Sequence, residues 1–164
     1  MSTDVEGLPP IVGGRPTVLI LGNAPSVLSL AAQQYYGNPR NAFWRIAGEL
    51  FSFDPSAPYA ERTAALVEHG VAVWDVLRFC RRAGSLDAAV ERDSMVANDF
   101  GAFFVSHPGI RRVFFTGGAA EANYRRLVHV DAEVSYARLP STSPAHTMPV
   151  AAKLAAWREI LARP

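Results

Sequence analysis

The sequence predicts an α/β fold in which a four-stranded parallel sheet lies between two layers of helices. Four short strand-like runs, at 17–22, 71–74, 112–116 and 134–139, are separated by segments with helical periodicity. Strands that alternate with helices favour a parallel sheet covered on both faces. Val18–Leu21 contains no polar residue, which is typical of a strand that is buried on both sides. We therefore expect a three-layer α/β/α sandwich.

The segments between these runs carry start and stop signals of helices. Helices are expected at 41–52, 58–69, about 98–106, 119–128 and 149–162. His69-Gly70 is a typical end of the second helix, and Asn98-Asp99 can cap the third. The lead-in 1–16 is rich in proline and glycine and is expected to be irregular. Residues 81–95 are expected to form an excursion with one short helix.

Composition and charge are those of one enzyme-sized domain, expected to span 1–164. No apolar run approaches the roughly 20 residues of a membrane span. The start of the chain lacks the features of a signal peptide, so a cytoplasmic location is expected. Cys80 is the single cysteine, which excludes an internal disulfide and any four-cysteine metal site. The net charge of +1 neither demands nor excludes a nucleic-acid partner.

The most informative segment follows the first predicted strand. Gly22-Asn23-Ala24-Pro25-Ser26 forms a loop with small side chains, placed where α/β folds bind ligands. Two tyrosines, two asparagines and an arginine then follow between Tyr35 and Asn41. Aromatic rings can stack on a flat ring, amides can read its edge, and arginine can hold a phosphate. Such a loop suits a protein that handles a nucleobase.

Four blocks of the sequence together resemble the uracil-DNA glycosylase superfamily, and most closely its hypoxanthine-DNA glycosylase-like branch. The resemblance spans about residues 17–160, and its blocks are Leu21–Ser26, Tyr35–Trp44, Gly70–Leu77 and Leu139–Ala145. It implies a monomeric, monofunctional enzyme of base excision repair. Such enzymes flip a deaminated base, hypoxanthine or uracil, out of double- or single-stranded DNA and hydrolyse its N-glycosidic bond. The resemblance implies no metal and no organic cofactor.

The resemblance implies two catalytic asparagines, Asn41 and Asn23. An amide oxygen can orient a water and support a sugar cation, but it is too weak a base to take the proton of water outright. Each asparagine also has a structural alternative. Asn41 precedes an amphipathic run and could cap a helix, and Asn23 could shape an Asx turn.

Base recognition is expected to involve Tyr36, Asp75, Phe43 and Gly22. In the resemblance, Tyr36 stacks on the flipped base, and Asp75 ends the strand whose last residue reads the base edge. A carboxylate accepts the lactam N–H of hypoxanthine or uracil, which adenine lacks. The alternatives are core packing for Tyr36 and Phe43, and for Asp75 a helix cap or an ion pair with Arg78 or Arg81.

Contact with the DNA backbone is expected from Arg40, Ser141 and Ser143. Ala145 and His146, with Met148, could fill the space that the flipped base leaves. The structural alternative for this loop is a proline-rich turn that caps the last helix through Thr147.

Two other functions fit parts of the sequence. A flavodoxin-like nucleotide-binding module could hold a phosphate where Gly117-Gly118 opens a helix. The sequence is also compatible with a catalytically silent relative that only binds lesions. Neither the loop Gly22–Ser26 nor the loop 140–146 has a carboxylate or histidine at the places that are usually catalytic.

Overall fold

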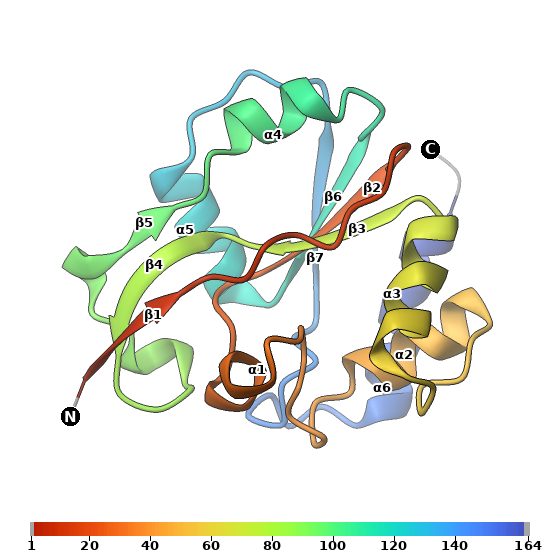
Figure 1. The fold of residues 1–164 in the computed structure, drawn as a ribbon, viewed down its shortest axis with the longest axis horizontal. Helices are drawn as coiled ribbons and strands as arrows, with labels where there is room; N and C mark the ends of the chain where they lie inside the picture. Colours follow the sequence, from red (N-terminus) through yellow and green to blue (C-terminus); the bar gives the residue numbers. More distant parts are fainter. Residues whose placement is uncertain (1, 163–164) are drawn as a thin grey trace.

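A four-stranded parallel sheet forms the centre of the computed structural model, which describes residues 2–162 (Figure 1). Its order is β3-β2-β6-β7. The bounds are Val18–Gly22 for β2, Val71–Asp75 for β3, Arg112–Thr116 for β6 and Ser135–Leu139 for β7. All neighbouring strands in this sheet run parallel. The predicted fold class is confirmed.

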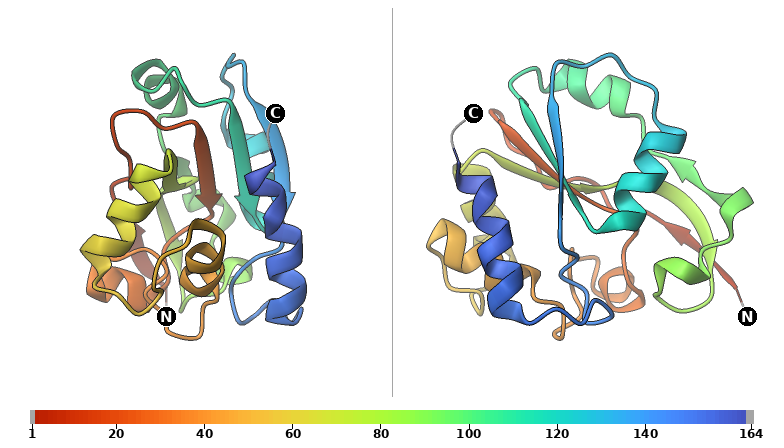
Figure 2. Two further views of the ribbon diagram at one scale, coloured as in Figure 1. Left: turned by 90° about the vertical axis from the view of Figure 1, so that its right-hand side faces the viewer. Right: turned by 180° about the vertical axis from the view of Figure 1, so that it is seen from behind.

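Helices cover both faces of the sheet (Figures 1 and 2). One face packs against α2 (Phe43–Phe51), α3 (Tyr59–Glu68) and α6 (Val150–Trp157), and the other against α4 (Phe100–Ser106) and α5 (Gly118–Leu127). Alternate residues of each strand serve the two cores. In β2, Ile20 belongs to the first core, whereas Leu19 and Leu21 belong to the second. Every residue of this strand is therefore apolar.

A second, three-stranded antiparallel sheet corrects the prediction for two segments. It consists of β1 (Thr3–Glu6), β4 (Leu77–Arg82) and β5 (Val96–Ala97), in the order β1-β4-β5. The lead-in 1–16 is therefore not wholly irregular. The segment 81–95 begins inside β4 and contains two 3₁₀ turns, η1 (Asp87–Ala89) and η2 (Arg92–Ser94), in place of one short helix. The three arginines of β4 make this segment resemble an exposed loop in the sequence, so the strand was not predicted, although Leu77 and Cys80 are buried.

The predicted helices are present with small shifts in their bounds, and one further helix was missed. The last helix, expected at 149–162, consists of α6 and a 3₁₀ turn, η3 (Arg158–Leu161). The missed helix is α1 (Val27–Ala32), which Ser26 begins by accepting a hydrogen bond from the Ser29 N–H. It has only six residues, so it shows too little periodicity to be recognised from sequence.

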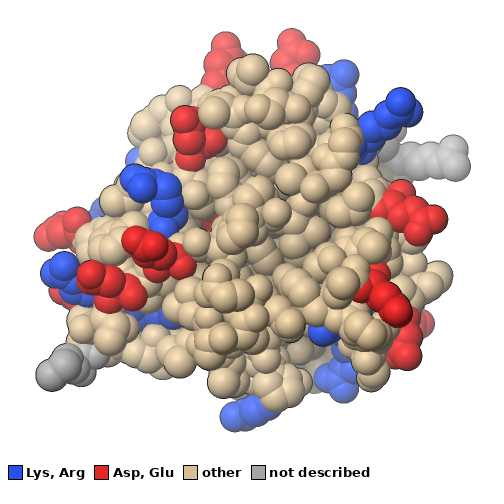
Figure 3. Space-filling view, in the orientation of Figure 1, with Lys and Arg blue, Asp and Glu red and all other residues tan. Residues whose placement is uncertain are grey.

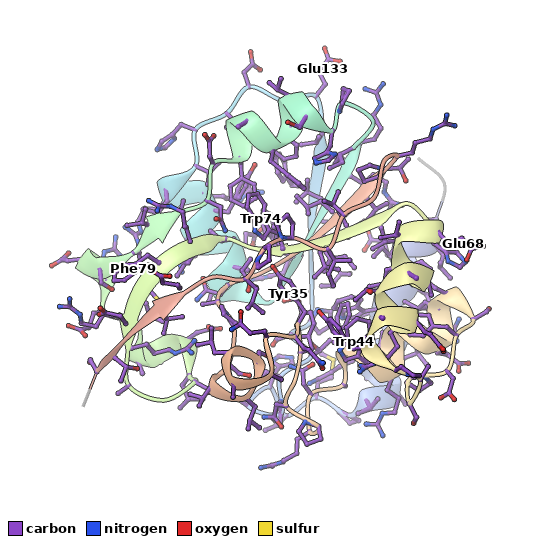
Figure 4. The ribbon with its side chains drawn as sticks, viewed as in Figure 1. Tyr35, Trp44, Glu68, Trp74, Phe79 and Glu133 are labelled. Atoms are coloured by element: carbon purple, nitrogen blue, oxygen red, sulfur yellow. The ribbon has the colours of Figure 1, made fainter. Side chains whose placement is uncertain are left out.

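Aromatic contacts fix the helices of the first face to one another. Trp44 of α2 meets Tyr59 of α3 edge to face at 5.7 Å, beside α3 in Figure 4. The Arg62 guanidinium lies 4.6 Å from the centre of the Trp44 ring. Phe43 meets Trp157 of α6 edge to face at 5.9 Å. These contacts hold the end of the Tyr35–Trp44 block against helices α3 and α6.

Charged side chains lie mainly around the rim of the face shown in Figure 3, and its centre is uncharged. This face therefore offers no broad basic surface for phosphate contact. No helix among residues 2–162 is long and apolar enough to cross a membrane.

The register of the sheet brings the strand ends to one level. Gly22 at the end of β2 is the partner of Asp75 at the end of β3, and Thr116 of β6 is the partner of Leu139 of β7. The loop after β7 and helix α1 lie together at this carboxyl edge (Figures 1 and 2). Open α/β sheets bind ligands at this edge.

Candidate functional site

A cavity of about 360 Å³ opens at the carboxyl edge of the parallel sheet. Its volume falls within the roughly 300–1,000 Å³ of small-molecule sites. The segments that form it are the loop after β2, the Tyr35–Asn41 block, the end of β3, the turn 85–88 and the loop after β7. The site residues expected from the sequence that line it are Gly22, Asn23, Tyr36, Asn41, Asp75, Ser141, Ser143, Ala145 and His146. Arg40 and Phe43 do not line it.

Asp75 and Tyr36 face one another across Gly22. A Cβ atom at Gly22 would lie 2.5 Å from Asp75 Oδ1 and 3.3 Å from the Tyr36 hydroxyl. A glycine is therefore required for the carboxylate and the phenol to approach the strand end. Asp75 Oδ2 and the Tyr36 hydroxyl are both buried. Asp75 Oδ2 has no hydrogen-bond partner among the described residues, whereas the side chain of Thr116 lies beside the Tyr36 hydroxyl as a hydrogen-bonding neighbour.

Burial raises the pKa of Asp75 from 3.8 to about 7. The residue Asp75 as a whole is 4% exposed, so water cannot solvate the charge of its carboxylate. The nearby charge of Asp87 raises the pKa further, and the guanidinium of Arg82 opposes both effects. Among residues 2–162 Asp75 forms no ion pair, and Arg81 instead pairs with Asp4 at 3.2 Å. The carboxyl group can thus be neutral or ionised near neutral pH.

Tyr36 lines the cavity, and its ring stacks on that of Phe43, with 4.0 Å between ring centres and 13° between planes. Phe43 is fully buried and does not line the cavity, which corrects the expectation that it contacts the base. Its ring instead packs against the ring of Tyr36. Tyr36 has a φ of 53°, an uncommon left-handed conformation for a tyrosine. Burial raises the pKa of its hydroxyl, so the group stays protonated and can donate.

Asn41 combines a structural role with exposure to the cavity. Its Oδ1 accepts a hydrogen bond of 2.9 Å from the N–H of Phe43, the first residue of α2, although the N-cap residue of this helix is Ala42. The next residue, Ala42, donates its N–H to the Thr142 carbonyl at 3.0 Å. This bond joins the aromatic-amide block to the loop after β7. Asn41 keeps its amide N–H groups and one lone pair for a ligand.

Asn23 is held from two sides rather than free in its loop. Its Nδ2 donates to Asp87 Oδ1 at 3.0 Å, and its Oδ1 accepts from Asn123 Nδ2 at 2.8 Å. Its backbone carbonyl accepts from the Leu77 N–H at 3.0 Å. The structure therefore places Asn23 at the centre of a side-chain network that crosses between separate elements.

The loop after β7 is anchored by helix α6. The single lysine, Lys153, is 3% exposed and donates from Nζ to the Ser143 carbonyl at 3.1 Å. Trp157 Nε1 donates to the Pro140 carbonyl at 2.9 Å. Ser141 and Ser143 each accept a backbone N–H within the loop, so their hydroxyl protons remain available to a phosphate. His146 is exposed at the rim of the cavity.

Comparison with known proteins agrees with this architecture. The chain is 33% identical over 113 residues to the hypoxanthine DNA glycosylase of Methanosarcina barkeri, which covers 68% of the chain and 70% of that protein. It is 33% identical over 116 residues to the hypoxanthine DNA glycosylase of Methanosarcina acetivorans, with 70% and 72% covered. The chain belongs to the uracil-DNA glycosylase superfamily.

The structural comparison extends the superfamily assignment to nearly the whole chain. A solution NMR structure from Methanosarcina acetivorans, provisionally described as a uracil DNA glycosylase, matches with a TM-score of 0.78. The match covers 98% of this chain and 100% of the other, at 28% identity. No family model matches the sequence.

This superfamily member has site residues that the sequence motifs did not reveal. Ser85, Leu86 and Asp87 line the cavity from the turn after β4. Arg82 is completely buried behind them and donates to the carbonyls of Pro25 and Gly84 at 2.6 Å each. An arginine inside a strand can indicate a functional site, but only its hydrogen bond to the Pro25 carbonyl connects Arg82 to the loop Gly22–Ser26. The described residues contain no cluster of side chains suited to holding a metal ion.

Proposed function

We propose that the protein is a monofunctional DNA glycosylase that removes a deaminated base, hypoxanthine or uracil. The observation that carries the proposal is the buried carboxyl group of Asp75, whose Oδ2 has no hydrogen-bond partner among the described residues, at a cavity that Tyr36 also lines in a superfamily member. Buried polar groups are almost always hydrogen-bonded, so an unsatisfied carboxyl oxygen in a residue that lines a cavity favours a ligand there. A flipped base offers the required donors and acceptors.

Base recognition in this proposal combines stacking with edge reading. The free face of Tyr36 stacks on the base, which contributes about 1–3 kcal/mol and does not by itself choose among bases. The choice comes from Asp75. Its ionised form accepts the lactam N–H shared by hypoxanthine and uracil and repels the ring-nitrogen lone pair of adenine. Its neutral form can also donate to the lactam carbonyl.

The remaining residues act on the sugar and the DNA strand. Asn41, which lines the cavity, supports the positive charge that develops on the sugar, while Ser141 and Ser143 at the cavity and Arg40 outside it bind phosphates. His146 occupies the space in the duplex from which the base has turned out. Extruding a mispaired base costs least, which adds selectivity for deaminated bases.

Base release from defined oligonucleotides tests the proposal. Duplex and single-stranded oligonucleotides carry one uracil, hypoxanthine, xanthine or mismatched thymine, and the free base is measured under single-turnover conditions. Release of hypoxanthine or uracil is expected, with hypoxanthine slightly ahead. Inactivity on every base, together with preferential binding to the lesion strand, would replace the proposal with a lesion-binding function.

A further inference from the structure

Asp87 reaches the cavity from outside the four sequence blocks that carry the superfamily resemblance. The turn that carries it leaves β4 at Arg82 and passes Gly84, which has a φ of 69°. Ser85 Oγ then accepts a 2.9 Å hydrogen bond from the Val27 N–H, which ties the turn to the start of α1. Asp87 follows in η1 and lines the cavity as an exposed side chain. The hydrogen bond of Ser85 thus ties the turn that carries Asp87 to helix α1.

A chain of hydrogen bonds fixes how the amides behind Asp87 are oriented. Arg126 Nη2 lies 3.5 Å from Asn123 Oδ1, Asn123 donates to Asn23, and Asn23 donates to Asp87. A guanidinium can only donate and a carboxylate can only accept, so the two ends permit one orientation of both amides. Asn23 therefore presents its N–H group, not its oxygen, to Asp87.

This orientation changes which group can act on a water. The oxygen of Asn23 is engaged by Asn123, and the oxygen of Asn41 accepts the Phe43 N–H. Both amides are far weaker bases than a carboxylate. Asp75 is buried beside Tyr36, where the base edge is expected. Asp87 is the carboxylate of the cavity that is both exposed and held by a donor.

We propose that Asp87 is the catalytic base that orients the attacking water and accepts its proton, an inference that depends on the proposed glycosylase function. The C1′–N bond breaks and its electron pair leaves with the base. The water oxygen bonds to C1′, one water proton passes to an Asp87 oxygen, and the departing base anion takes a proton from solvent. Asn23 acts as a positioning residue that aims the carboxylate.

The test compares Asp87→Asn with a matched control, Asp93→Asn. Both aspartates are exposed and belong to a three-residue 3₁₀ turn, but Asp93 does not line the cavity. Asp87→Asn can still accept the Asn23 N–H, and it should lower single-turnover base release by about 10²–10³-fold. Asp93→Asn should leave it unchanged. Binding to a duplex with a cleavage-resistant 2′-fluoro hypoxanthine nucleotide should stay equal or tighten, because a negative charge near the phosphates is removed.

Chemical rescue separates catalysis from structure. Asp87→Ala opens space for a small carboxylate, so added formate should restore part of its rate, whereas chloride at the same concentration should not. A rate within threefold of the wild type for Asp87→Asn overturns the inference. Loss of rate and of 2′-fluoro duplex affinity together, without formate rescue, also overturns it, because the role is then structural. A wild-type protein inactive on every base defeats the proposed function itself, and the inference falls with it.

Discussion

Replacing Asp75 by Asn should stabilise the protein, and increasingly so as the pH rises. The side chains have nearly the same shape, but the amide cannot ionise. The folded protein holds the pKa of Asp75 at about 7, compared with 3.8 for the ordinary group. Because this pKa is raised, the stabilising contribution of the neutral group is complete below pH 3.8 and is lost as pH rises to about 7. The wild type therefore carries a buried charge at pH 8 that the variant lacks.

The magnitude follows from the two pKa values. One unit corresponds to about 1.4 kcal/mol, so the full shift is worth about 4 kcal/mol as an upper value. Part of it is already lost near pH 5. The stability difference between Asp75→Asn and the wild type should therefore grow by about 2–3 kcal/mol between pH 5 and pH 8. A change of this size is a large fraction of the stability of a domain.

Urea unfolding of both proteins at the two pH values measures this difference, with Asp93→Asn as the control for removing one carboxylate. A difference between Asp75→Asn and the wild type that stays constant with pH would refute the reasoning. It would mean that the carboxyl group is solvated or paired in solution. Growth of the difference would show that Asp75 is kept at the site at a cost in stability, as is common for functional groups.

Three further predictions concern activity. Asn41→Ala should lower single-turnover base release by about 10²–10³-fold, as expected for the loss of one preorganised polar group; a few-fold effect with the fold intact would make Asn41 structural. His146→Gly should reduce activity on duplex more than on single-stranded substrates, because only the duplex must be opened; equal losses would contradict the prediction. Asp75→Ala should weaken discrimination against undamaged bases by about 1–3 kcal/mol, measured by competition with unmodified duplex, and unchanged selectivity would rule out base reading by Asp75.

Local patterns in the sequence were sufficient to predict the central sheet. The apolar residues of β2 and the compact run of β6 indicate burial on both faces, so both strands were predicted within one residue of their bounds. The placement of Gly22, Asp75 and Ser141 around one cavity follows from the same reasoning, because parallel strands end at one edge. Strand β4 was missed because its arginines resemble a solvated face, although Arg82 is fully buried.

The sequence by itself determined the order of the elements, the edge at which ligands bind and the superfamily, because each of these is encoded in short runs of neighbouring residues. Only the tertiary structure decided that Phe43 supports Tyr36 and that the Asp75 carboxyl is desolvated. It also decided that Asn23 bonds to Asp87, 64 residues away, and to Asn123, 100 residues away. Such contacts depend on how distant segments pack, and no local periodicity specifies them.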